Sequence, residues 1–224
     1  MPGRQGRLLF AFLAVRPYRT ASRDELLDAI WPGELPSAPE LALSALISKL
    51  RRLLGPEVIG GRAQVGLSLP PNAWIDVESA RSAIHRAESF LETGRPWSAY
   101  GPAVTARYIS ERSFLPGEVA PWIDRVRGEL DDIHARAIEC DARIGLAVGG
   151  HEGPIAIQSA KRLIELEPYR ESGYRLLMEA LEREGNVAEA VRVYDELRRR
   201  LREDLGTAPS VEVRSVYERL LAGA

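Results

Sequence analysis

The chain has 224 residues, of which 45% are hydrophobic and 28% charged, and its formal net charge is −2. This composition is typical of a soluble globular protein and argues against a disordered or fibrous chain. No apolar run approaches the roughly 20 residues that a membrane-spanning helix needs, so we expect no membrane partner. The single cysteine, Cys140, cannot form an internal disulfide, which favours a reducing cytoplasm and a role for Cys140 as a small core residue.

Positive charge is concentrated near the start of the chain. Residues 1–70 carry nine Lys or Arg and six Asp or Glu, a net charge of +3, whereas residues 71–224 carry 21 and 26, a net charge of −5. A mildly basic first part beside an acidic remainder is expected if only the first part contacts a polyanion such as nucleic acid.

The sequence pattern of residues 1–56 predicts three helices in succession. The first runs from Gly6 to Val15 and ends near Pro17, because the residue before a proline avoids the helical region. Each of the next two begins with Ser-x-x-Glu, a capping box in which each side chain satisfies the other residue's free amide. These boxes are Ser22 with Glu25, before DELLDAIW, and Ser37 with Glu40, before LALSALISKLRRLL.

A β-hairpin is predicted directly after the third helix. The β-prone runs are Val58-Ile59 and residues 65–69, and Gly-Gly-Arg-Ala-Gln joins them as a turn. Three helices followed by a hairpin is the order of a winged helix-turn-helix, so we assign that fold to residues 1–70. The adjacent prolines Pro70 and Pro71 mark the end of this first domain.

Residues 75–224 predict an all-α domain. Helical stretches are expected at about 76–93, 97–111, 121–148, 153–166, 170–184, 186–204 and 210–222. Ala156, Ala160 and Leu163 recur 34 residues later as Ala190, Tyr194 and Leu197, and 34 is the length of a tetratricopeptide repeat. The predicted fold class is therefore mainly α, with a winged helix-turn-helix followed by an all-α, tetratricopeptide-like repeat domain.

Several segments together resemble one known family. They are SRDELLDAIW and LISKLRRLLGP in the first domain, then FLPGEVAPWIDRVR and ESGYRLLMEALEREGNVAEAVRVYDELRRRLREDLGTAPS in the second. The chain resembles the Streptomyces antibiotic regulatory protein family, activators that join an OmpR-like winged helix to a bacterial transcriptional activator domain. This resemblance implies binding to double-stranded promoter DNA, often as tandem copies, and contact with RNA polymerase. OmpR-like domains open with a β platform, which we expect to be absent or to lie upstream of Met1.

The third helix is the expected DNA-reading element. Around Ile47, Leu43, Leu50 and Leu54 form an apolar core face. We expect the DNA-contacting residues to be Ser44, Ala45, Ser48, Lys49, Arg51 and Arg52 on this helix, with Arg62 and Gln64 on the hairpin.

The chemistry of that helix favours contact with phosphates over reading of bases. Its first half offers Leu41 and Ala45 and no Arg, Asn or Gln that could read base edges. Lys49, Arg51 and Arg52, near the carboxyl end, suit phosphate contacts, which position a protein without specifying a sequence. The same three cations could instead be a solvated helix end that complements the helix dipole.

The sequence shows no pattern of an enzyme. His85, His134 and His151 lack the spacing of metal ligands, and Gly149-Gly150 lies between two helices without a phosphate-binding motif. We therefore expect no catalytic residues, no metal site and no cofactor.

Two functional hypotheses remain. The first is a DNA-binding transcriptional regulator, an activator whose helical domain self-associates, as a homodimer, or contacts RNA polymerase. The alternative is a protein-interaction or ligand-sensing module with a degenerate winged helix that no longer reads DNA sequence. Salt-dependent binding to promoter DNA separates the two.

Overall fold

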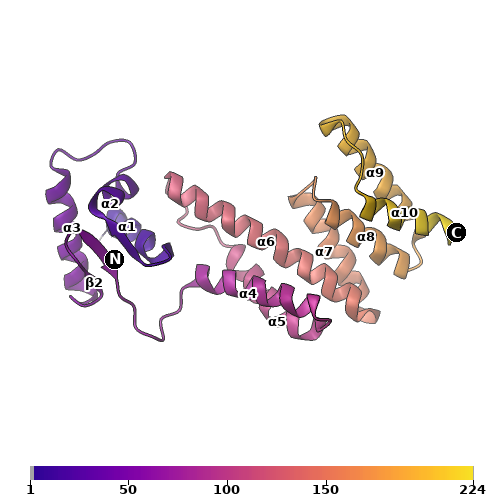
Figure 1. Ribbon diagram of the computed structural model, residues 1–224, viewed down its shortest axis with the longest axis horizontal. Coiled ribbons are helices and arrows are strands. Elements are labelled where there is room, and N and C mark those ends of the chain that lie inside the picture. Colours follow the sequence, from indigo (N-terminus) through magenta and orange to yellow (C-terminus); the bar gives the residue numbers. More distant parts are fainter. Residues whose placement is uncertain (1–2, 224) are drawn as a thin grey trace. The chain divides into compact units, whose positions relative to one another are not determined.

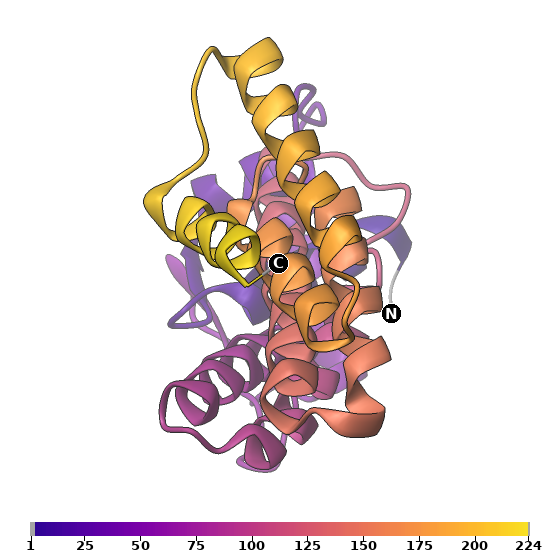
Figure 2. The same ribbon diagram turned by 90° about the vertical axis from the view of Figure 1, so that its right-hand side faces the viewer.

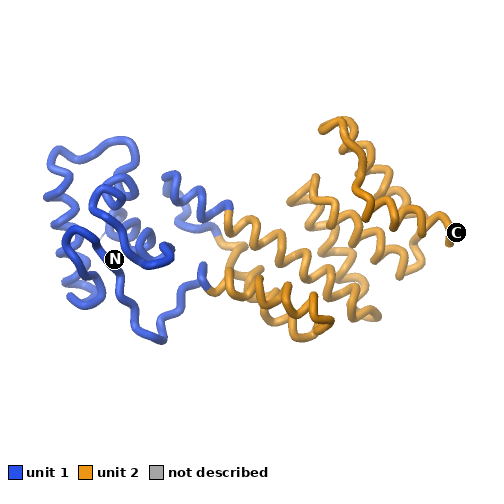
Figure 3. Tube along the Cα trace, viewed as in Figure 1, with its two compact units in different colours: residues 1–78, 113–128 blue, residues 79–112, 129–224 orange. Residues whose placement is uncertain are grey.

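The computed structural model describes residues 3–223, and its contacts divide the chain into two units that interleave in sequence (Figure 3). Unit 1 comprises the residues up to Glu78 together with Ser113–Gly128, and unit 2 comprises Ser79–Arg112 and the residues from Glu129 onward. The sequence changes from a mixed to an all-helical pattern at residues 70–75. That this change is also a boundary between domains stays a prediction. The contacts assign residues 113–128 to unit 1.

Unit 1 contains the helices α1, α2 and α3, a small antiparallel sheet and the first residues of α4 and α6 (Figure 1). The sheet order is β1-β3-β2, so the expected hairpin of β2 and β3 is confirmed and β1 pairs with its outer side. Their order along the chain is that of a winged helix-turn-helix with one additional strand. The bounds are α1 Gly3–Val15, β1 Thr20–Ser22, α2 Arg23–Ile30, α3 Pro39–Leu54, β2 Ile59–Gly60 and β3 Gln64–Leu67.

The two expected capping boxes have different outcomes. At α2 the box is confirmed, because the Glu25 amide donates to Ser22 Oγ and the Ser22 amide donates to the Glu25 carboxylate. At α3 the expectation of a box between Ser37 and Glu40 is wrong, since the N-cap is Ala38 and no side chain caps it. Pro39 instead occupies the first turn, where a proline is favoured because it lacks the amide that would need a partner.

Residues 113–128 complete the core of unit 1. Trp122 is buried, its indole Nε1 donates to the Ala29 carbonyl at 3.1 Å, and its ring meets Phe12 edge to face at 5.2 Å between centroids. The Arg127 guanidinium donates to the carbonyls of Phe114, Leu115 and Glu118 and so holds the loop before this segment's helix. Burial of an aromatic side chain with a satisfied indole is a large stabilising contribution.

Unit 2 is helical, and its expected helices are confirmed with ends that differ by at most one residue. None of the helices within residues 3–223 has both the length and the apolar character required to cross a bilayer. The division into units falls within α4 and α6. The bounds are α4 Asp76–Glu92, α5 Pro96–Ser110, α6 Pro121–Val148, α7 Gly153–Leu166, α8 Glu171–Arg183, α9 Val187–Leu205 and α10 Val211–Ala222, with a 3₁₀ turn at Gly150–Glu152.

The 34-residue recurrence corresponds to equivalent buried positions. Ala156 in α7 and Ala190 in α9 are both buried, as are Leu163 and Leu197. Helices α7, α8, α9 and α10 pack in one array, with α8 in contact with the other three (Figures 1 and 2). Small residues at the recurring positions allow close helix packing, as expected for a helical repeat.

Two bidentate ion pairs fix the register of α4 against α6 within unit 2. Arg81 pairs with Glu129, and Glu88 pairs with Arg136. The partners advance by seven residues on both helices, so α4 and α6 run parallel. The carboxylates of Glu88 and Asp132 raise the pKa of Arg136 and keep it charged.

Candidate nucleic-acid interface

Helix α3 separates a core face from an exposed face, as its sequence predicts. Leu43, Ile47 and Leu50 are buried in the core of unit 1. The exposed residues of α3 that the sequence proposed for DNA contact are Ser44, Ala45, Ser48, Lys49 and Arg52.

Arg51 differs from its neighbours on α3 because it is committed to a structural contact. Its guanidinium donates to the carbonyls of Ile59 and Gly61, both at 2.7 Å. These two carbonyls belong to β2 and to the hairpin turn, so Arg51 fastens the hairpin to the end of α3. Charge-assisted hydrogen bonds of this kind are stronger than neutral ones. Arg51 therefore acts first as a brace between two parts of the expected DNA-binding surface.

A second arginine, Arg23, joins α2 to the start of α3, a role that no sequence motif predicted. Arg23 Nε donates to the Glu40 carboxylate at 2.5 Å, and Arg23 Nη2 donates to the hydroxyl of Ser44 at 2.8 Å and to the Glu40 carbonyl. One signal was available, because a cation in the first turn of a helix is unfavourable against the helix dipole unless it has another partner. The side chains of Glu40 and Ser44 are therefore already engaged in contacts within the protein.

A groove with a volume of about 460 Å³ lies between α3 and the hairpin. The hairpin turn on one side depends on Gly61, whose φ is +84° and where a Cβ would lie 1.8 Å from the Gln64 carbonyl oxygen. No other residue fits that turn, so its shape is fixed by glycine. The groove is lined by Arg23, Ser44, Ile47, Ser48, Arg51, Gly61, Arg62 and Ala63.

Three cations of α3 and the hairpin are available to a ligand, and one of them, Arg62, lines the groove. Lys49, Arg52 and Arg62 are exposed, and within residues 3–223 none of them has a hydrogen bond or an ion pair. Gln64 is also exposed, at the first position of β3. Ser48 and Arg62 both line the groove, whereas Lys49, Arg52 and Gln64 are exposed elsewhere on the same two elements, which Arg51 joins. Such a surface can bind a polyanion through its phosphates.

The comparisons with known proteins define the family. The model of the bacterial transcriptional activator domain matches residues 75–221. The chain therefore belongs to the bacterial transcriptional activator domain family, and its resemblance to the Streptomyces antibiotic regulatory proteins is confirmed.

Two relatives are regulatory proteins by name, and both are longer than this chain. Regulatory protein AfsR of Streptomyces coelicolor is 32% identical over 97% of this chain, which spans only 22% of AfsR. Transcriptional regulatory protein MoaR1 of Mycobacterium tuberculosis is 26% identical over 96% of this chain and 71% of MoaR1.

One solved structure has the same fold over nearly the whole chain. The structure of Mycobacterium tuberculosis EmbR in complex with a low-affinity phosphopeptide aligns with a TM-score of 0.85 and 20% sequence identity. The alignment covers 98% of this chain and 59% of EmbR. At this identity the likeness establishes the fold of this chain and not its ligands.

Proposed function

We propose that the chain is a DNA-binding transcriptional regulator that binds double-stranded promoter DNA through α3 and the β2-β3 hairpin. The observation that carries the proposal is a set of exposed cations that have no partner within residues 3–223: Lys49 and Arg52 on α3, and Arg62 on the hairpin that Arg51 joins to α3. Because Arg51 holds the two elements together, binding to a rigid duplex needs to order the cationic side chains but not the backbone that carries them.

The helical repeat supports the second half of the proposal, activation. By family resemblance, unit 2 contacts RNA polymerase or joins two copies of the chain, and the regulator acts in the cytoplasm without a membrane partner. Binding of tandem copies at a promoter would raise occupancy through effective concentration. These roles rest on the family and on the named regulators among its relatives.

The alternative is a protein-interaction or ligand-sensing module whose winged helix no longer reads sequence. One observation favours it. The amino-terminal half of α3 exposes Leu41 and Ala45, while Glu40 and Ser44 are engaged by Arg23. That half is where base-reading residues usually stand in a helix-turn-helix protein.

Binding to DNA at several salt concentrations tests the proposal. The chain is titrated with a duplex from its own upstream region and with a random duplex, and log affinity is plotted against log salt. We expect a steep slope that becomes shallower by about 0.9 for each cation removed in Lys49→Ala, Arg52→Ala and Arg62→Ala. The control is Arg199→Ala, an exposed cation of α9, which should leave the slope unchanged. Absence of binding to either duplex at low salt would favour the alternative.

A further inference from the structure

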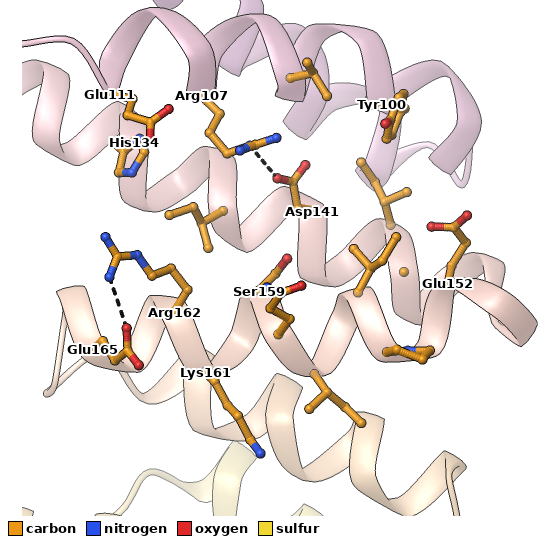
Figure 4. Close-up of a pocket in the computed structure, with 18 of the residues that line it drawn as sticks. Tyr100, Arg107, Glu111, His134, Asp141, Glu152, Ser159, Lys161, Arg162 and Glu165 are labelled. Atoms are coloured by element: carbon orange, nitrogen blue, oxygen red, sulfur yellow. Dashed lines mark hydrogen bonds and ion pairs between the residues drawn. The ribbon is translucent and has the colours of Figure 1, made fainter.

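Unit 2 contains a groove that the proposed DNA-binding function does not use (Figure 4). Its volume is about 930 Å³, and it lies between α5 and α7 with α6 beneath. On one side its lining runs from Tyr100 in α5 to Glu111 just beyond that helix, and on the other from Pro154 to Glu165 in α7. Each span covers about three helical turns, or about 16 Å, so the groove is long as well as open.

Helix α5, which forms one wall, has its small residues inside and its large ones outside. Ala99, Ala103 and Ala106 are completely buried. Trp97 and Tyr108 are 67% and 61% exposed, and Tyr100, which lines the groove, is 55% exposed. The three aromatic residues lie within about 80° of one another around the helix.

An aromatic stripe of this kind indicates a contact surface. Isolated exposed apolar residues are common on soluble proteins, but these three aromatic residues share one face of α5, and Tyr100 itself lines the groove. The groove also has apolar lining, to which Val104, Ile138 and Ile155 contribute one side chain from each of the three helices.

The charges along the groove do not cancel. The cations are already paired: Arg107 Nε lies 2.9 Å from Asp141 Oδ2, and Arg162 Nη1 lies 3.1 Å from Glu165 Oε2. Lys161, the third cation, pairs with Glu189 outside the groove at 3.2 Å.

Three carboxylates that line the groove, those of Glu111, Glu152 and Glu184, have no ion pair within residues 3–223. Glu111 and Glu152 line opposite ends of the groove (Figure 4). Glu111 follows the last turn of α5, where the helix dipole is negative and a carboxylate is unfavourable without a cation. The Glu184 carboxylate lies against Gly153 at the favourable start of α7. A cationic partner would relieve this excess of negative charge.

We propose that this groove binds a basic amphipathic α-helix of a partner protein. The occupant has apolar side chains at positions i, i+4 and i+7 facing Val104, Ile138 and Ile155, and Lys or Arg near each end facing Glu111 and Glu152. Helices that dock into grooves commonly use such an i, i+4, i+7 spacing. A helix of three to four turns matches the length of the groove.

The direct test is binding of a synthetic helical peptide to the full chain. The probe is a fluorescent peptide of about 16 residues with Leu at three groove-facing positions and Lys at both ends. One control peptide replaces each Lys with Glu, and a second replaces each Leu with Ser. Fluorescence anisotropy should show saturable one-to-one binding of the probe and at least tenfold weaker binding of both control peptides.

Comparing variants in the groove with control variants outside it shows whether the peptide binds in the groove. Glu111→Gln with Glu152→Gln should weaken binding about fivefold, the sum of two partly exposed ion pairs. Ile155→Ser should weaken it as well. The matched control, Glu203→Gln with Glu218→Gln, removes two exposed carboxylates of α9 and α10 and should have no effect. Circular dichroism confirms that each variant is folded.

Three results would overturn the proposal. The first is that the probe does not bind, and the second is that the groove variants and the control variants change binding equally, which would indicate attraction to the acidic surface alone. The third is that sedimentation shows the chain dimerising through this groove and excluding the peptide, in which case the occupant is a second copy of the chain.

Discussion

Arg51 and Arg52 are neighbours in sequence, but their guanidinium groups have different surroundings. Arg51 donates to two backbone carbonyls of the hairpin, whereas Arg52 is exposed and has no partner within residues 3–223. The charge of both residues is visible in the sequence, but the partner of a long side chain is set by tertiary structure.

Arg51→Ala should therefore lower the free energy of unfolding, by about 1–3 kcal/mol, because two carbonyls lose charged donors. Arg52→Ala should change it by less than about 0.5 kcal/mol, as is usual for an exposed side chain. Urea denaturation of both variants measures the difference. Equal stability of the two would mean that Arg51 does not brace the hairpin.

Glu25 makes part of the stability of unit 1 dependent on pH. The hydrogen bond from the Ser22 amide lowers the pKa of Glu25, and Arg16 contributes to the same effect. A carboxyl group whose pKa is lowered on folding stabilises the protein above its unfolded pKa, and this stabilisation is lost as the pH falls through the folded pKa. Comparing wild type with Glu25→Gln, we expect a stability advantage at pH 7 that shrinks below about pH 4.5. Urea denaturation at several pH values measures it, and an advantage that grows with acid would contradict this account.

Cys140 should be unreactive in the folded protein. It is buried in α6, as its sequence context predicts, and burial raises the pKa of its thiol to about 12. Only the thiolate is nucleophilic, and little of it forms near neutral pH. A thiol-specific reagent at pH 8 should modify Cys140 slowly in the native chain and rapidly in urea. Rapid modification of the native chain would show that α6 opens readily.

The position of the cations along helix α3 decides how they contact DNA. On α3, Lys49 and Arg52 lie in the carboxyl-terminal half, beyond the turns that usually enter the major groove. Replacing either with Ala should weaken binding of cognate and random duplex by similar factors, because phosphate contacts carry no sequence information. Competition titrations measure both affinities. A loss of about 1–3 kcal/mol confined to the cognate duplex would show that Arg52 reads a base.

Trp122 tests the contribution of the segment 113–128 to unit 1. Trp122→Ala should cost about 3–5 kcal/mol of unfolding free energy, because it leaves a cavity and an unpaired Ala29 carbonyl. The matched control is Trp97→Ala, which removes an exposed indole from α5 and should cost little. Denaturation followed by circular dichroism compares them, and a small cost for Trp122→Ala would show that unit 1 holds together without this segment.

The elements differ in how far the sequence alone could predict them. Long helices such as α6 follow from their apolar period and from the glycines and prolines that end them. Strand β1 has three residues, too few to show a period, and forms only because β3 pairs with it. The expected box at Ser37 failed because Pro39 begins the helix and Glu40 turns to Arg23.

In the chain as a whole, residues that are distant in sequence share one core. Trp122 and Ile123 belong to the core of unit 1, although the sequence between them and Glu78 contains α5 of unit 2. Residues 1–75 alone would therefore lack part of their core. We expect that fragment to unfold without a cooperative transition, whereas the full chain unfolds cooperatively. Cooperative unfolding of the fragment in urea would contradict this expectation.

We expect residues 76–222 to fold on their own, but that fragment would lack the partners of Trp122 in unit 1. Trp122, which is buried in the full chain, would be exposed to water in the isolated fragment. Circular dichroism should show strongly helical content with a cooperative melt from the helices of unit 2. Tryptophan fluorescence should shift toward the emission of a hydrated indole. An unfolded fragment would mean that the two units depend on each other for stability.

The proposed DNA interface consists of α3 and the hairpin and excludes the acidic helices. Ultraviolet cross-linking of the full chain to promoter duplex containing bromodeoxyuridine, followed by peptide mapping, tests it most directly. Unit 1 carries the unpaired cations Lys49, Arg52 and Arg62, whereas residues 71–224 have a net charge of −5. We predict cross-links within residues 39–67, and fewer of them when these three cations are replaced by Ala. Cross-links mainly in the helices after Asp76 would contradict this proposal.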